Sequence, residues 1–392
     1  MIDTIVLVLK QSMFVIIDHD RFEPSTRSLY GDASMGSRGY ATYKQNPTPT
    51  ELKNGIYKPR LTVTRRFNDG VLERTMKIEF SAPKLLYKNN FVEIEDKDFE
   101  EIVDTLKKTL REDMGVLVSM DTLVNAPASS IHYSKNIKLT NGLIAFTVLK
   151  ELSKANITKR LDFNQSDFRN EGHSIKYHAN SYEIAFYDKV KDLQQAKISE
   201  KRAVEKDNAI QIGLFDDIQQ FRKQKPFELL RMEARLNQRQ KIRQVLKIIG
   251  NEVEPTFQNL FKKEIAQKVL LYYLGEIEKH CPKTLYFEPK SNKNFLAQFM
   301  IDNPKAKIKD TILAFGFHKA LEEVTARELK ELLKRYPQSS WYRFISQMNN
   351  YSYPKNALDI FKPIRQSIEQ FEPLSLLDFE AEMLNNDKYL VI

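Results

Sequence analysis

The sequence predicts an α+β protein in which an antiparallel sheet comes first and an all-helical region comes last. Apolar residues alternate with a period of two in the earlier segments and recur with helical spacing beyond about Gln240. Gly, Pro, Asn and Asp mark the turns between these segments. We expect an N-terminal α/β part over 1–120, a second α/β unit over 121–250 and a helical domain over 251–392.

The length and net charge of the chain restrict the class of protein and the partners to expect. The chain has 392 residues, of which 42% are hydrophobic, so it can fold into two or three globular domains. The net charge of +9 is spread along the whole chain. Nucleic acid is therefore the leading expected partner, and an anionic membrane surface is the second.

The number of cysteines and the hydropathy of the chain indicate the cellular compartment to expect. The single cysteine, Cys281, excludes a disulfide framework and a cysteine-based zinc site, which fits a reducing cytosol. The apolar start has no cationic leader, so we expect strands there and no signal peptide. No apolar run approaches the roughly 20 residues that span a bilayer, so we expect no spanning segment. Of the two candidate partners we expect nucleic acid and no membrane.

The first α/β part begins with strand-like runs and continues with a hairpin and a helix. "TIVLVL" and "FVII" predict strands, and "RLTVTRR" and "RTMKIEFSA" predict a hairpin around "FNDG". The polar stretch 24–55 predicts an irregular connection. A helix follows over 98–115, with Asp98 as its N-cap and Gly115 as its stop.

The second unit predicts the order strand, helix, hairpin, strand. Its segments are "SSIHYSKNIKL", helical "GLIAFTVLKELSKAN", two strands in "SIKYHANSYEIAFYDK" around Ala179 and Asn180, and "LLRMEARL". A further helical stretch, "KISEKRAVEKDN", intervenes before the last strand. Such a split βαβ arrangement leaves one sheet face open, on which side chains can converge.

The helical region carries four long segments with apolar residues at helical spacing, over 241–253, 256–280, 310–324 and 325–351. Thr325 and Glu328 form a capping box at the start of the last segment. The two helices joined at "YPQSS" could form a helix-turn-helix that reads DNA, although any helical bundle offers such a pair. The acidic end, 367–392, packs back or frays.

Four polar residues of the second unit are candidates for chemistry. Tyr187 ends one strand, Glu233 lies inside an apolar strand, and His132 and His178 lie in neighbouring runs. Each also has a structural interpretation. Tyr187 could be a packing residue, Glu233 could pair with an arginine on its own strand, His132 could be a hydrogen-bonded half-buried histidine and His178 could be solvated.

Histidine, carboxylate and tyrosine in a basic protein match the needs of metal-assisted attack on a phosphodiester. A divalent cation bound by imidazole and carboxylate would polarise the scissile phosphate. Tyr187 would then attack as the nucleophile, and Lys189 would stabilise the phenolate or neutralise the departing oxygen. The product would be a phosphotyrosine.

Five segments come in the order found in one family of replication proteins: "MIDTIVLVL", "IEFSAPKLL", "SIHYSKNI", "YHANSYEIAFYDK" and "LRMEARL". In these segments the chain resembles the gene II and gene X replication proteins of filamentous phages, from Met1 to about Arg243. The helical region beyond carries no matching motif.

The resemblance implies a rolling-circle replication initiator with a Rep/HUH-like nuclease core. Such an enzyme nicks one strand at a replication origin, keeps the 5′ phosphate on a tyrosine and later rejoins the strand. The resemblance places the nucleophile at Tyr187, the following lysine at Lys189 and the glutamate of the "R.EAR" strand at Glu233. It implies single- and double-stranded origin DNA, a host helicase and a polymerase as partners, in the cytoplasm of a bacterial host.

The expected metal is Mg²⁺ or Mn²⁺. His132 stands where the family has an aspartate, which favours the softer ion of the two. His132 and Glu233 alone do not complete a metal site. His178 or Glu183 could supply a further ligand, and His178 is preferred. No GxxxxGK phosphate loop occurs, so ATP-driven unwinding is not built in and a host helicase is implied.

Basic residues near the open face are expected to contact DNA phosphates. They are Arg65, Arg66, Lys84, Lys135, Lys138, Arg231 and Arg235. Two other functions stay open: a DNA-binding replication regulator that has lost catalysis, and a relaxase or transposase with the same chemistry. We expect a single-tyrosine cycle, because the motif holds one candidate nucleophile and no paired tyrosine close by. Tyr177 and Tyr182 could act second, but Tyr182 should point to the face opposite Tyr187.

Overall fold

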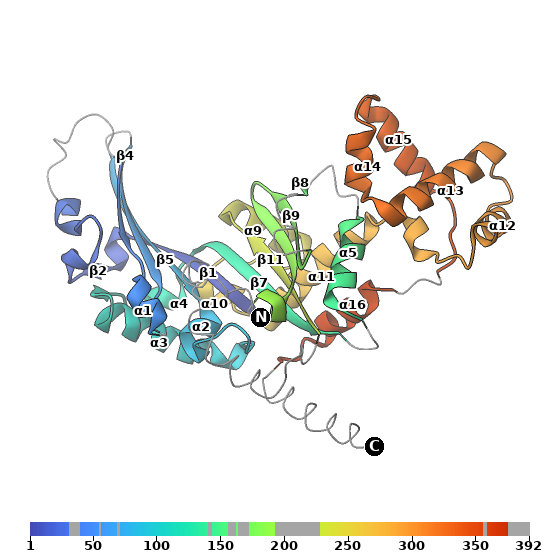
Figure 1. The fold of residues 1–392 in the computed structure, drawn as a ribbon. Helices are drawn as coiled ribbons and strands as arrows, with labels where there is room; N and C mark the ends of the chain where they lie inside the picture. The colour runs from blue at the N-terminus through green and yellow to red at the C-terminus, as the bar shows by residue number, and fades with distance from the viewer. Residues whose placement is uncertain are drawn as a thin grey trace, which may run out of the picture.

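The structure is a computed structural model, and it describes residues 1–30, 40–54, 56–68, 71–139, 143–155, 162–163, 172–192, 228–355 and 359–374. The protein is α+β, with a large antiparallel sheet and many helices (Figure 1). Within these ranges no helix has both the length and the apolar content needed to cross a membrane.

The described strands form one nine-stranded antiparallel sheet and one small pair. The sheet order is β3-β4-β5-β1-β7-β11-β10-β9-β8, and β2 pairs with β6. The strands are β1 (Ile2–Lys10), β2 (Val15–Ile16), β3 (Tyr40–Gln45), β4 (Arg60–Asn68), β5 (Val71–Ser81), β6 (Val116–Leu117), β7 (Ala128–Lys138), β8 (Asp162–Phe163), β9 (Ser174–Ala179), β10 (Tyr182–Asp188) and β11 (Leu229–Leu236).

The large sheet consists of two halves with the same strand order. Each half starts at the centre of the sheet, with β1 or β7, crosses to the outer edge and returns strand by strand to pair with its own first strand. β1 and β7 pair antiparallel at the centre, with Ile5 opposite Ile131. Each of these two strands has a β-bulge two positions before its residue of this pair, at Asp3 on β1 and at Ser129 on β7. A local twofold relation therefore links the halves.

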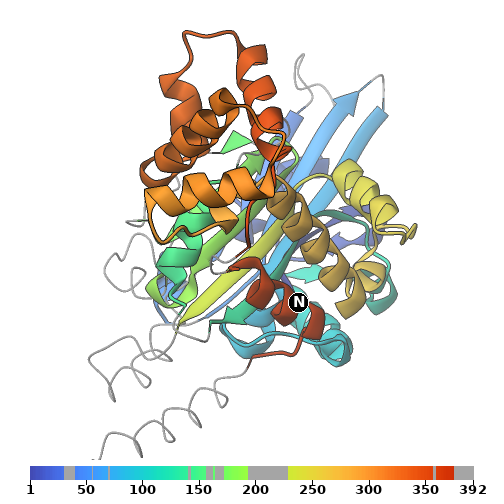
Figure 2. The same ribbon diagram turned by 90° about the vertical axis from the view of Figure 1, so that its right-hand side faces the viewer.

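Helices cover one face of this sheet. The described helices are α1 (Pro49–Lys53), α2 (Ala82–Tyr87), α3 (Phe99–Glu112), α4 (Met120–Val124), α5 (Ala145–Ser153), α9 (Arg239–Ile248), α10 (Phe257–Leu260), α11 (Lys263–Lys279), α12 (Asn292–Asp302), α13 (Ile308–Glu323), α14 (Ala326–Leu332), α15 (Gln338–Asn349) and α16 (Phe361–Gln370). Figure 1 shows α1 to α4 beneath the first half, and Figure 2 shows α16 in front of the strands of the second half.

The alternation of burial along each strand explains which face is covered. On β1, Ile5, Leu7 and Leu9 are fully buried, while Val6 and Val8 between them are only half-buried. The same period of two runs along β4 and β5, whereas β11 and the second half of β7 bury nearly every residue, and the buried apolar side chains of all these strands share one core with the helices. The opposite face keeps polar side chains and is partly open to solvent.

A second, smaller core lies in the C-terminal helices. It is formed by aromatic and aliphatic side chains of 287–348, such as Phe295, Phe299 and Phe317. α11 and α16 instead belong to the core of the sheet. The expected boundary at residue 120 falls between the two halves of one sheet, and the one at 250 falls just after α9.

Most expected elements are confirmed. The strands of both α/β parts, the hairpin of β4 and β5, α3 and α5 lie where alternation and helical spacing predicted them. The capping box of Thr325 and Glu328 is present at the start of α14. The helix expected over 197–208 lies outside the described residues, as does the acidic end beyond 374.

Two details differ from expectation. The polar stretch 24–55 contains an edge strand, β3, where Tyr43 is the buried residue. Asp98 does not cap α3 with its side chain, because its carboxylate accepts a hydrogen bond from the Glu95 backbone instead. Gly115 follows α3 with φ of 65°, a conformation that favours glycine.

Candidate functional site

Strand pairing brings the candidate residues together on the open face of the second half. Tyr187 on β10 lies opposite Arg231 on β11. Two residues farther along β11, Glu233 lies between Ala185 on β10 and Ser134 on β7. Since residues two apart on a strand share a face, these side chains line one surface. Tyr187 and Glu233, singled out in the sequence, are therefore neighbours.

A short hydrogen bond links the tyrosine and the glutamate. The Tyr187 hydroxyl donates to Glu233 Oε1 at 2.5 Å. Arg231 Nε donates to the same oxygen at 2.9 Å, and Arg235 Nε donates to Oε2 at 2.8 Å. Both carboxylate oxygens therefore have charged donors.

The arginines decide the ionisation of Glu233. Burial would raise the pKa of this carboxyl, which is 2% exposed, but the charges of Arg235 and Arg231 hold that pKa well below its usual range. Burial and the negative charge of Glu233 raise the pKa of the Tyr187 phenol well above its usual value. At neutral pH the pair is thus a phenol donating to a carboxylate.

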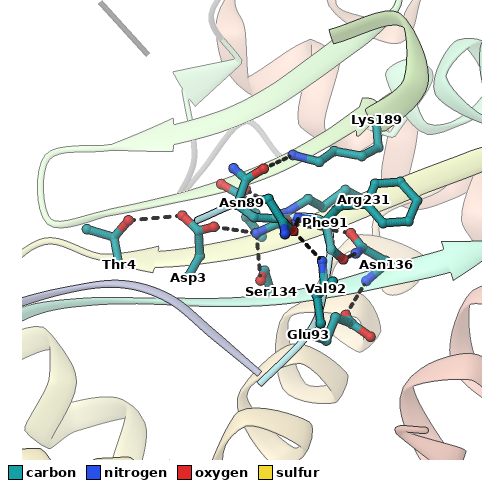
Figure 3. Close-up of polar contacts among 12 residues, drawn as sticks. Asp3, Thr4, Asn89, Phe91, Val92, Glu93, Ser134, Asn136, Lys189 and Arg231 are labelled. Atoms are coloured by element: carbon teal, nitrogen blue, oxygen red, sulfur yellow. Dashed lines mark hydrogen bonds and ion pairs between the residues drawn. The ribbon is translucent and has the colours of Figure 1, made fainter. Parts of the chain in front are cut away.

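Arg231 is the centre of a buried polar network (Figure 3). Its guanidinium donates to Asp3 Oδ1 at 2.5 Å, to Ser134 Oγ at 3.0 Å and to the Asn90 carbonyl at 2.7 Å, in addition to Glu233. Asp3 reaches Arg231 across β7 because the register shift at Asp3 turns its side chain out of the regular alternation of β1. Arg231 therefore has no exposed donor, being 2% exposed.

A loop from the first half closes one side of this network. Asn90 precedes α3, and its side-chain oxygen accepts a hydrogen bond from Lys189 Nζ at 2.7 Å. Lys189 is 1% exposed, and its ammonium lies 5.9 Å from the centre of the Tyr187 ring. Burial, with the charge of Arg231 as a second cause, lowers the pKa of Lys189 from 10.5 to about 7. Lys189 can therefore exchange a proton near neutral pH.

The two histidines lie in one row of residues with Glu183 and Arg235. His178 faces Glu183, Glu183 faces Arg235 and Arg235 faces His132 on successive strands. Three strand spacings separate the two histidines, which is about 14 Å. The Glu183 carboxylate accepts from Arg235 at 2.7 Å, and His178 Nδ1 lies 3.5 Å from it.

The expected metal-ligand set is therefore not gathered. His132 and His178 are too far apart to bind one ion, and Glu233 is neutralised by arginines. In the part of the chain that the structure describes, no three His, Cys, Asp or Glu side chains are placed to hold a metal ion. Burial and the charge of Arg235 lower the pKa of His132, so its imidazole is neutral at pH 7.

Two of the expected DNA contacts, Lys135 and Arg231, are 1% and 2% exposed and have internal partners. Lys135 points to the covered face, where its ammonium donates to Glu93 at 2.5 Å and to the Glu372 carbonyl at 2.6 Å. The Arg231 guanidinium already donates to the acceptors described above. Because a phosphate would have to displace these partners, both side chains act in this structure as parts of the protein interior.

The other expected contacts are divided by burial. Arg65 and Lys84 are 9% and 6% exposed, and both also have partners inside the protein. Lys138, at the end of β7, is half-buried. Arg66 is exposed on the open face of β4, and the Arg235 side chain is 27% exposed. Arg66, Arg235 and Lys138 are therefore the expected contacts with solvent-accessible side chains.

The other tyrosines near the site point away from it. Tyr182 lies on the covered side, where its ring stacks on Tyr273 of α11 with centroids 5.3 Å apart. The Tyr177 hydroxyl is buried and donates to the Leu152 carbonyl. The expectation that Tyr182 points to the face opposite Tyr187 is confirmed, and neither tyrosine is placed to act as a second nucleophile.

Sequence reasoning missed Asp3, Asn90 and Ser134. Asp3 and Asn90 are separated from Arg231 by 228 and 141 positions along the chain. One signal was available for Asp3, which is the only charged residue between Met1 and Leu9, at the start of an apolar strand. A charge there needs a buried partner.

The comparisons with known proteins add no relative. Neither a protein-family model, nor a curated protein, nor a solved structure matches this chain.

Proposed function

We propose that this protein cuts and rejoins one strand of DNA through a covalent bond between Tyr187 and a 5′ phosphate. The observation that supports this most is the 2.5 Å hydrogen bond from the Tyr187 hydroxyl to Glu233, on the open face of a basic protein. A nucleophile and a proton acceptor at hydrogen-bond distance are the elements that covalent catalysis needs.

The cutting step balances with residues of this network. The Tyr187 oxygen forms a bond to the scissile phosphorus while the bond from phosphorus to the 3′ oxygen breaks. The phenol proton passes to Glu233 Oε1, and the departing 3′ oxygen takes a proton from the Lys189 ammonium. The reverse step, with a 3′ hydroxyl as the attacking group, rejoins the strand and returns both protons.

Arg235 couples binding of the phosphate to activation of the tyrosine. With both arginines on it, Glu233 is too weak a base to take a phenol proton. Arg235 is the arginine that solvent reaches, so an arriving phosphate draws its guanidinium away from Glu233. The pKa of Glu233 then rises, and the carboxylate becomes a better acceptor.

The resemblance to filamentous-phage replication proteins supports a rolling-circle initiator as the biological role. Origin DNA, a host helicase and a polymerase are then its partners. Mg²⁺ or Mn²⁺ stays a prediction of the sequence, because the described side chains do not fit a three-ligand site. Adduct formation with and without EDTA tests the metal requirement.

Covalent capture tests the proposed chemistry. The purified protein is incubated with a randomised pool of single-stranded oligonucleotides labelled at the 3′ end, and denaturing gels detect label attached to protein. We expect an adduct with the wild type and with Tyr182→Phe, and none with Tyr187→Phe. An adduct that survives Tyr187→Phe contradicts the proposed chemistry. A wild type that binds the pool without forming an adduct favours the DNA-binding regulator.

A further inference from the structure

We propose that the open face of the first half of the sheet, formed by β1, β5, β4 and β3, binds the sugar-phosphate backbone of a single DNA strand. This extends the proposed function, because it names the surface that holds the substrate of Tyr187. The binding itself does not depend on the chemistry at Tyr187.

Strand pairing arranges hydroxyl and ammonium groups in rows across this face. Lys77, Thr62 and Lys44 lie side by side on β5, β4 and β3. Two positions farther along, Thr75, Thr64 and Thr42 form the next row. Threonine hydroxyls and lysine ammoniums bind phosphate and sugar oxygens without reading bases.

The lysines of this face are available to a ligand. Lys44 and Lys77 are exposed, and neither forms an ion pair with any residue that the structure describes. The acidic residues on the same face are Glu73 and Glu79, and both lie on β5. The region over β4 and β3 is therefore basic, with Arg66 as a further exposed cation.

An aromatic side chain at the edge of the sheet favours an unpaired strand. Tyr40 on β3 is 66% exposed and lies opposite Arg66 on β4. An exposed ring beside a cation is a stacking platform for a base. A duplex keeps its bases stacked inside, and its major groove admits a helix or a two-stranded ribbon but not the face of a wide sheet.

The same face leads to the candidate site. The sheet is continuous from β3 to β8, and β1 and β7 join the two halves. Lys77 occupies the position equivalent to Glu233. Phe80 on β5 pairs with Ile5, Leu236 on β11 pairs with Ile131, and Lys77 and Glu233 each lie three residues before these partners. A strand that crosses the row of Lys77 therefore continues over β1 and β7 toward Tyr187.

Binding measured without chemistry tests this surface. In the Tyr187→Phe background, fluorescence anisotropy gives the dissociation constant for a labelled thymidine homopolymer of about 20 nucleotides at several salt concentrations. Each lost phosphate contact lowers the salt slope by about 0.7 for a single strand, so Lys44→Gln with Lys77→Gln should lower it by about 1.4. Tyr40→Ala should weaken binding roughly tenfold, and Tyr40→Phe should not.

A matched control removes the same charge from the opposite side of the sheet. Lys107 and Lys108 are exposed on α3, which packs on the covered face, so Lys107→Gln with Lys108→Gln should leave the salt slope unchanged. Equal slopes for the two double variants overturn the inference, as does a loss confined to duplex DNA. Because all variants carry Tyr187→Phe, failure of binding is distinguishable from failure of the tyrosine chemistry.

Discussion

Where the second half of the sheet has Glu233, the first half has Lys77, and where the second half has Tyr187, the first half has Thr64. The strand order and the central bulges are the same in both halves. On the open face of the second half, buried charged side chains form a network around Arg231 and Glu233. On the open face of the first half, exposed lysines lie among half-buried threonines, with two exposed glutamates on β5.

This difference shows how one sheet can divide two tasks. A buried carboxylate between two arginines holds a phenol in a fixed orientation, but it leaves few donors free for a long substrate. Exposed lysines hold a substrate through its charge, but they do not orient a reacting atom. The two halves therefore suit chemistry and binding respectively, and paired substitutions at equivalent positions test this division.

The largest difference in the free energy of unfolding is expected between the variants Glu233→Gln and Lys77→Gln. Removing the carboxylate leaves Arg231 and Arg235 without their shared counter-charge, which costs about 3–5 kcal/mol for a broken buried pair. Lys77→Gln changes an exposed side chain and should cost less than about 0.5 kcal/mol. Urea unfolding measures both, and equal midpoints for the two variants would mean that the network adds no stability.

The second difference concerns pH and Lys189. Burial, followed by the charge of Arg231, lowers its pKa from 10.5 to about 7, so folding releases a proton between these values. The wild type therefore gains stability as pH rises through this window, with a slope of up to about 1.4 kcal/mol per pH unit from this group. Below pH 7 the full cost of burying the charge is present.

Lys189→Met removes that dependence. The stability of the variant relative to the wild type should be highest below pH 7 and should fall as pH rises toward 10. Lys77→Met, which removes an exposed amine from the first half, is the paired substitution. Thermal unfolding at pH 6, 8 and 10 measures both variants, and parallel curves for Lys189→Met and the wild type would exclude a depressed pKa.

The smallest difference in the free energy of unfolding is expected between substitutions at the two bulges, Asp3 and Ser129. Asp3→Asn removes one of the charged acceptors of Arg231 and should cost about 1.5–3 kcal/mol. At the equivalent position, Ser129 Oγ donates to the Val6 carbonyl at 3.3 Å, so Ser129→Ala should cost at most about 1 kcal/mol. Urea unfolding of the two variants compares them. A larger loss for Ser129→Ala would mean that the bulge, and not the ion pair, needs the polar side chain.

The strands and the shared face of Tyr187 and Glu233 could be predicted because both follow from local alternation. The expected strand "LLRMEARL" coincides with β11, Leu229–Leu236. Once β10 and β11 pair, their period of two settles which residues meet.

Strand order and long-range partners could not be predicted from local patterns. The convergence expected for His132 and His178 fails because β11 and β10 lie between their strands. β3 was missed because "YATYKQ" has no aliphatic residue larger than alanine and buries only Tyr43, as an outermost strand of the sheet can. Asp3 and Asn90 join the site only through tertiary packing, which no spacing in the sequence records.

Peptide mapping of the protein after reaction with single-stranded DNA tests the central claim most directly. The wild type is incubated with the oligonucleotide pool, digested with nuclease and trypsin, and analysed by mass spectrometry for a residual nucleotide phosphate on tyrosine. We expect the modification on Tyr187, and none on Tyr182 or Tyr177. A nucleotide attached to any residue other than Tyr187 would contradict the role assigned to the pair of Tyr187 and Glu233.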